Sequence, residues 1–157
     1  ESGQNTDILF VLINEAKKND PDNASLYYVE GNIYKELGQT ENAVKAYYKC
    51  ADINPNSEFG YVGVGILSYN PAIELQQKAA DEFDDKKYEA IVAEFNTALK
   101  NAIEPFEKAF EVSKDNSIKV NVAEYLKNIY YRFSSESQEY MDGYKKYNEI
   151  VKSGQAM

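Results

Sequence analysis

Several residue types that proteins use for chemistry or for covalent staples are missing from this chain. Its 157 residues include no histidine, no tryptophan and a single cysteine, Cys50. One cysteine cannot form an internal disulfide, and a zinc site without histidine needs several thiolates. Without an imidazole there is also no Ser-His-Asp or Cys-His arrangement. We therefore expect a fold held together by packing alone, with no metal, no cofactor and no enzymatic activity.

Positive charge is scarce as well. Acidic residues number 26 against 17 basic ones, which leaves a net charge of -9, and Arg132 is the single arginine. This balance disfavours nucleic acid and anionic membrane surfaces. No apolar run approaches the ~18 residues of a membrane span. We expect neither a nucleic-acid partner nor membrane insertion. No targeting segment is evident, so the compartment stays open, with the periplasm or cell envelope slightly favoured over the cytoplasm.

The chain does contain an internal repeat with a period of 34 residues. On either side of Gly38, small and aromatic residues recur every three or four positions, as on the faces of two helices. Small residues let two helices approach closely, and tyrosines fill the wider gaps. We expect Cys50 to be a small core residue, because no histidine is available to activate it as a reactive thiol. The residues 34 apart are Pro21 and Pro55, Tyr27 and Tyr61, and Gly31 and Gly65.

This unit resembles the tetratricopeptide repeat (TPR), in its bacterial form. The resemblance implies an all-α fold, an α-solenoid of antiparallel helix pairs with about 2.5 to 3 repeats, forming one TPR-like domain over residues 1–157. Glu30 stands where the family usually has leucine. The positions that match the family pattern are Tyr27, Gly31, Tyr34, Ala43, Tyr47 and Pro55.

Four segments divide the domain. Residues 5–21 match the second helix of a preceding repeat, 23–56 form a full repeat, 57–115 form a repeat with an extended hairpin, and 117–153 form a degenerate repeat. A chain that opens on half a repeat leaves one helix face uncovered. We expect either an excerpt of a longer protein or an array with an improvised cap.

The extended hairpin follows from spacing. The second-helix pattern recurs 59 residues on instead of 34, so 25 residues are inserted. The inserted residues predict a projecting helical hairpin, the finger, with its tip at residues 84–87. The two arms of the finger are expected to bury their apolar residues mainly against each other. Pro71 is expected to break the outgoing arm, with Asn70 as a cap, and Pro105 to kink the return arm. The acids Asp81, Glu82, Asp84 and Asp85 lack the pattern of a calcium loop, so we interpret them as a solvated tip.

As a family, TPR arrays bind proteins or peptides in a concave groove lined by the first helix of each repeat. The resemblance therefore implies a non-catalytic interaction or scaffold module. Two alternatives stay open: a small-ligand or glycan-binding protein of the cell envelope that uses exposed tyrosines, and an architectural segment of a longer solenoid. Exposed solenoid ends also offer a surface for self-association.

The repeat alignment predicts which residues line this groove. Asn32 and Asn128 stand where many TPR grooves use asparagine to bond a peptide backbone, whereas Tyr28 replaces the lysine of a carboxylate clamp, so a clamp is not expected. Tyr28, Tyr69, Tyr125 and Tyr131 have no packing assignment among the 14 tyrosines and suit partner contacts. The residues expected to bind a partner are Tyr28, Asn32, Lys35, Phe59, Val62, Ile66, Tyr69, Tyr125, Asn128, Tyr131 and Arg132, with Ser25, Asn121 and Glu124 on the same projected faces.

Overall fold

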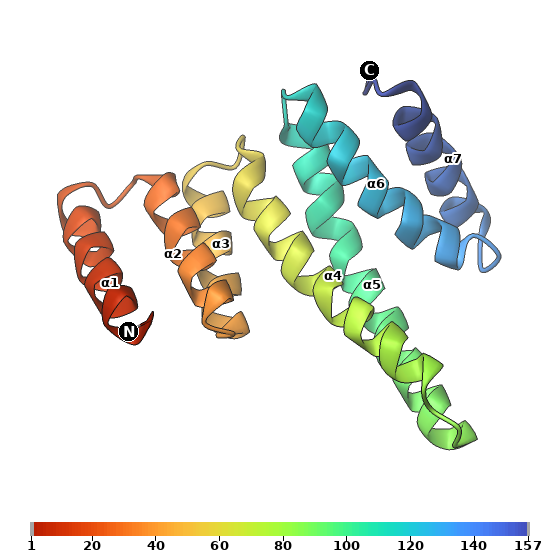
Figure 1. Cartoon of the computed structure of the whole chain (residues 1–157). Helices are drawn as coiled ribbons and strands as arrows, with labels where there is room; N and C mark the ends of the chain where they lie inside the picture. The colour runs from red at the N-terminus through yellow and green to blue at the C-terminus, as the bar shows by residue number, and fades with distance from the viewer. Residues whose placement is uncertain (1, 157) are drawn as a thin grey trace.

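The computed structural model describes residues 2–156, and every regular element in that range is an α-helix. Successive helices run antiparallel in an extended row, with α1 and α7 at opposite ends (Figure 1). This confirms the predicted all-α solenoid of helix pairs. The helices are α1 (Ser2–Asn19), α2 (Ala24–Glu36), α3 (Thr40–Ile53), α4 (Glu58–Ala80), α5 (Asp85–Val112), α6 (Asn116–Phe133) and α7 (Gln138–Ser153).

The α2–α3 pair forms because local capping and close packing agree. The Asn23 side chain accepts a hydrogen bond from the Ser25 backbone N–H, 3.1 Å away, at the start of α2. Gly38 follows the helix with a φ of 70°, in the left-handed region that glycine adopts without strain. A Cβ added to Gly31 would lie 2.5 Å from the Tyr47 ring, so the two helices meet where the sequence predicted.

Glycine facing an aromatic ring is the recurring packing device of this molecule. Gly63 meets the same Tyr47 ring, Gly65 meets Phe106 and Gly143 meets Tyr130, each within 2.7 Å of an added Cβ. Because glycine leaves room for a flat ring to lie against the helix backbone, the aromatic side chains fill the gaps between neighbouring helices. Cys50, predicted as a small core residue, is 2% exposed, and burial raises the pKa of its thiol.

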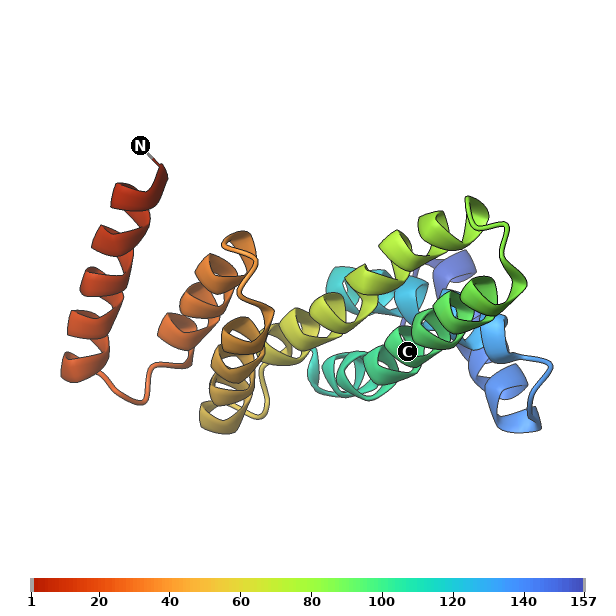
Figure 2. The same ribbon diagram turned by 90° about the horizontal axis from the view of Figure 1, so that it is seen from below.

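Helix α1 stands apart from the rest and packs mainly against α2 (Figure 2). The Phe10 and Tyr34 ring centroids are 4.8 Å apart. Lys17 forms an ion pair with Glu30 and lies 4.2 Å from the centroid of the Tyr27 ring. This ion pair explains the acidic residue at position 30, because Glu30 joins α1 to α2 where most repeats have an apolar contact.

The α4–α5 hairpin corrects two predictions. Pro71 does not break the outgoing arm, and Asn70 does not cap it, because α4 is one helix from Glu58 to Ala80. The Pro71 ring is exposed, while Leu67 and Ala72 on either side of it are buried, so packing holds the helix across the missing hydrogen bond.

The tip of the hairpin also lies earlier than predicted. The turn spans residues 81–84 rather than 84–87, because α5 begins at Asp85. The Asp84 side chain accepts a hydrogen bond from the Lys87 backbone N–H at 3.0 Å and so fixes the first turn of α5. Helix α5 is continuous through Pro105. The kink near Pro105 stays a prediction.

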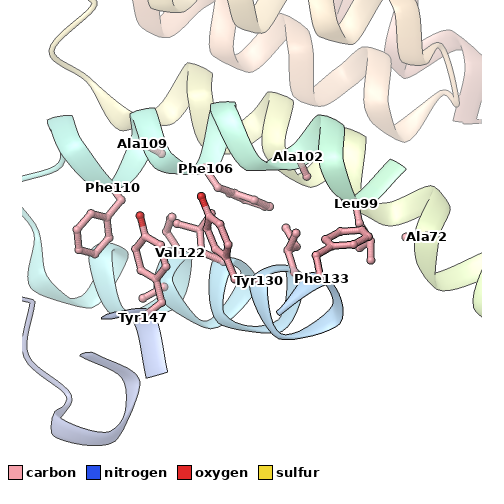
Figure 3. Close-up of a cluster of buried hydrophobic side chains, with 13 residues drawn as sticks. Ala72, Leu99, Ala102, Phe106, Ala109, Phe110, Val122, Tyr130, Phe133 and Tyr147 are labelled. Carbon is pink, nitrogen blue, oxygen red and sulfur yellow. The ribbon is translucent and has the colours of Figure 1, made fainter. Parts of the chain in front are cut away.

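The larger core lies between α5, α6 and α7 (Figure 3). Phe106 is completely buried, and the rings of Tyr130 and Tyr147 stack with centroids 5.7 Å apart. Both tyrosine hydroxyls donate hydrogen bonds to the same carboxylate oxygen of Glu107, at 2.7 and 3.3 Å, which satisfies the polar atoms of this core. Burial and the Glu107 carboxylate raise the pKa of both hydroxyls.

Two more residues of this core come from the base of the finger. Ala72 is 2% exposed, and Phe95 packs against the same cluster. The apolar residues farther out are not buried between the arms as predicted, since Ile73 is 57% and Tyr88 is 47% exposed. Across residues 2–156, no helix combines the length and the apolar character that crossing a membrane requires.

Candidate functional site

A hollow of about 520 Å³ lies on the face shared by α2, α4 and α6, the first helices of successive pairs. We call this hollow the groove. Five of the residues expected to bind a partner line it together, although they lie up to 97 positions apart in the chain. They are Tyr28, Phe59, Val62, Ile66 and Tyr125.

The groove also contains residues that the repeat alignment did not select. Ile118 and Val122 line it from α6, and Glu58 lines it from the first turn of α4. The third repeat drifts from the family spacing, so the projected stripe on α6 missed these two apolar positions. The spacing of 118, 122 and 125, by four and then three, carried the signal that could have found them.

Aromatic contacts hold the floor of the groove in place. The Tyr28 ring centroid lies 5.4 Å from that of Phe59 and 5.8 Å from that of the buried Tyr47. Tyr125 stacks on Phe106 with centroids 4.7 Å apart. Such pairs restrict the side chains before any partner arrives, which lowers the entropic cost of binding.

Tyr69 and Tyr125 separate the groove from a second hollow. Their rings meet edge to face with centroids 5.1 Å apart, and Tyr125 lines the groove whereas Tyr69 lines the neighbouring hollow of about 440 Å³. Burial raises the pKa of the Tyr69 hydroxyl, with smaller contributions from Tyr125 and Glu124.

The second hollow, which we call the hairpin cleft, lies where the finger meets α6. It brings together Tyr69, Asn128, Tyr131 and Arg132, so the structure divides the projected site in two. The finger contributes the residues that the sequence reasoning missed, Ile73, Gln76, Phe95 and Leu99. An adjoining hollow of about 330 Å³ continues toward the tip and shares Gln76, Phe95 and Arg132.

Two of the residues expected to bind a partner, and Ser25 on the same projected face, lie outside both hollows. The Asn32 side-chain oxygen accepts a hydrogen bond from the Tyr47 hydroxyl at 2.7 Å. The Asn32 amide oxygen therefore bonds to a core side chain, and the binding of a peptide backbone by Asn32 stays a prediction. Lys35 forms an ion pair with Glu36, 3.4 Å away.

The two hollows differ in charge. Glu58 and Glu124 stand among the residues that line the groove, with Glu124 paired to Lys127. In the hairpin cleft the Arg132 guanidinium lies 5.8 Å from the Phe95 ring centroid. Among residues 7–156, whose side chains the structure describes, no carboxylate forms an ion pair with Arg132. The groove is thus mainly apolar with acidic residues, and the cleft mixes apolar and polar side chains around one cation.

Two comparisons with known proteins bear on this chain. Residues 24–57 match the family model described as the tetratricopeptide repeat. The chain is also 36% identical over 75 residues to the TPR repeat-containing protein MJ1428 of Methanocaldococcus jannaschii. That alignment covers 47% of this chain and 13% of the archaeal protein, so the chain spans only a small part of that relative.

Proposed function

Because the chain is a tetratricopeptide repeat protein, and such repeats generally mediate contacts between proteins, we propose that it is a non-catalytic module that binds a peptide segment in the groove. The observation that carries this proposal is the convergence of seven aromatic and aliphatic side chains from α2, α4 and α6 around one hollow of about 520 Å³. A surface of this kind recognises apolar side chains.

The charge of the groove selects the kind of segment. Glu58 and Glu124 line it, and the protein as a whole carries a net charge of -9. Opposite charge around an apolar contact steers association and suppresses wrong partners. The favoured ligand is therefore a segment with one or two large apolar side chains flanked by lysine or arginine. An acidic segment of the same apolar content would be repelled.

A pair of matched variants tests the groove. Phe59 in the groove and Tyr48 on α3 are both 47% exposed, so replacing either with serine removes an aromatic ring of equal exposure. Peptides selected by phage display on the intact protein would be titrated by calorimetry against both variants. Losing one buried aromatic contact removes about 1.5–3 kcal/mol, or roughly a 10- to 100-fold loss of affinity.

The expected result is that Phe59→Ser weakens binding by at least that lower factor while Tyr48→Ser binds like the parent. Replacing the basic residues of the selected peptide with glutamate should abolish binding to all three proteins. Thermal melts show whether each variant is folded. If folded Phe59→Ser binds with parental affinity, or if selection returns acidic peptides, the proposal is wrong.

A further inference from the structure

The tip of the finger presents one aromatic ring to solvent. Phe83 is 96% exposed, more than any other large hydrophobic residue in the range 7–156. The turn that carries it is ordered by its own side chains, since Glu82 Oε1 accepts hydrogen bonds from the backbone N–H groups of Phe83 and Asp84, at 3.0 and 2.9 Å. Acidic residues surround the ring in sequence, from Asp81 to Asp85. The tip is therefore an exposed aromatic side chain flanked by acidic residues.

The hairpin cleft has the complementary properties. Its walls combine apolar and aromatic side chains, among them Ile73, Phe95 and Tyr131, with polar ones such as Gln76 and Asn128, and its volume of about 440 Å³ can accept an aromatic side chain. Arg132 is the single arginine of an acidic protein, and among residues 7–156 it forms no ion pair. A guanidinium beside an apolar cleft favours an apolar group that carries negative charge nearby.

The finger has the right length to join these two features between molecules. The distal part of the hairpin extends past α6 (Figure 1). From Ile73 in the cleft to Ala80 beside the tip, α4 rises about 11 Å. If two fingers lie antiparallel and overlap over this length, the tip of each reaches the cleft of the other. Gln76 lies midway along this overlap and lines both the cleft and the adjoining hollow, so the two hairpins would approach most closely there.

We propose that this protein forms a two-fold symmetric dimer in which the Phe83 tip of each finger inserts into the hairpin cleft of the other copy. The acidic tip then faces the partner's Arg132, and the symmetry makes this contact twice. The contact surface is one face of a short two-helix hairpin, at the low end of specific interfaces, so the dimer is concentration-dependent. It uses neither the groove nor the ends of the solenoid, and it stands independently of the proposed peptide binding.

Sedimentation velocity over a concentration series tests the dimer. The parent should form dimers reversibly at protein concentrations up to about 200 μM, as a weak interface of this size allows. Phe83→Ser and Arg132→Glu should each raise the dissociation constant at least about tenfold, equivalent to the loss of about 1.4 kcal/mol. Ile8→Ser, on the exposed face of α1, is the control for association through a solenoid end and should leave the dimer unchanged.

A cross-link locates the contact. Position 76 lies close to the proposed two-fold axis, so mild oxidation of a Gln76→Cys variant should give a disulfide-linked dimer, whereas Lys152→Cys on α7 should not. Cys50 is buried and does not compete. A parent that stays monomeric up to that concentration overturns the proposal. So does a dimer that survives Phe83→Ser and Arg132→Glu, or one that Ile8→Ser removes.

Discussion

Replacing Gly60 with alanine sets two physical effects of opposite sign against each other. Gly60 is buried in the first turn of α4 against α3. An added Cβ would lie 2.6 Å from the Tyr47 carbonyl oxygen and 2.9 Å from the Ala51 amide nitrogen. Both obstacles are backbone atoms of a helix, so neither can rotate aside. On helix propensity alone the same substitution would stabilise α4 by about 1 kcal/mol.

The size of the clash decides whether Gly60→Ala stabilises or destabilises the protein. Ordinary contact with a Cβ begins at 3.4 Å, so α3 and α4 must move apart by about 0.8 Å, a gap that forfeits a quarter to a half of the dispersion energy of the atoms involved. Overpacking of this kind costs about 3 kcal/mol when the obstacle cannot move. After the propensity gain, the net loss is about 2 kcal/mol, or roughly 4–8 °C in melting temperature for a domain of this length.

Thermal melts followed by circular dichroism measure this directly. Asn70→Ala is the matched control, because Asn70 is exposed on the same helix and only the propensity effect applies there. It should melt at or slightly above the temperature of the parent. A Gly60→Ala variant that also melts at or above the parental temperature would refute the assigned clash.

Buried tyrosines, a helix cap and the finger each allow a further test. Burial raises the pKa of Tyr47 from 10.0 to about 12, so the folded protein holds a proton that the unfolded chain releases. Melting temperature should therefore be constant below about pH 10 and fall above it, with tyrosinate absorbance rising on unfolding. Asp115→Ala removes the acceptor for two backbone N–H groups of α6 and should cost about 1 kcal/mol in urea melts, while Asp115→Asn costs less. Deleting residues 77–92 should lower helix content without global unfolding, since the finger base stays.

The repeat and its close contacts could be predicted because glycine and aromatic residues are physically constrained. Gly31 faces Tyr47 as the 34-residue pattern required, and α4 and α5 are longer than α2 and α3. Pro71 misled the prediction because its breaking effect is local, whereas burial of Leu67 and Ala72 stabilises the helix on both sides.

The site was harder to predict than the fold. Spacing places residues on a helix face, and Tyr28, Phe59 and Tyr125 do line one groove. Spacing does not show which polar atoms already have partners, so the bond from Tyr47 to Asn32 was invisible in the sequence. The hairpin cleft depends on how the finger packs against α6, which no periodicity encodes.

Mapping a bound peptide on the protein by NMR would show whether the groove is the binding surface. Backbone amide and methyl shifts would be followed while a selected peptide is added to the intact chain. We expect the largest changes on Val62, Ile66, Ile118, Val122 and the residues around Tyr125, with small changes on α1 and α7. Changes centred on α1, α7 or the outer face of α3, with the groove residues unmoved, would contradict binding in the groove.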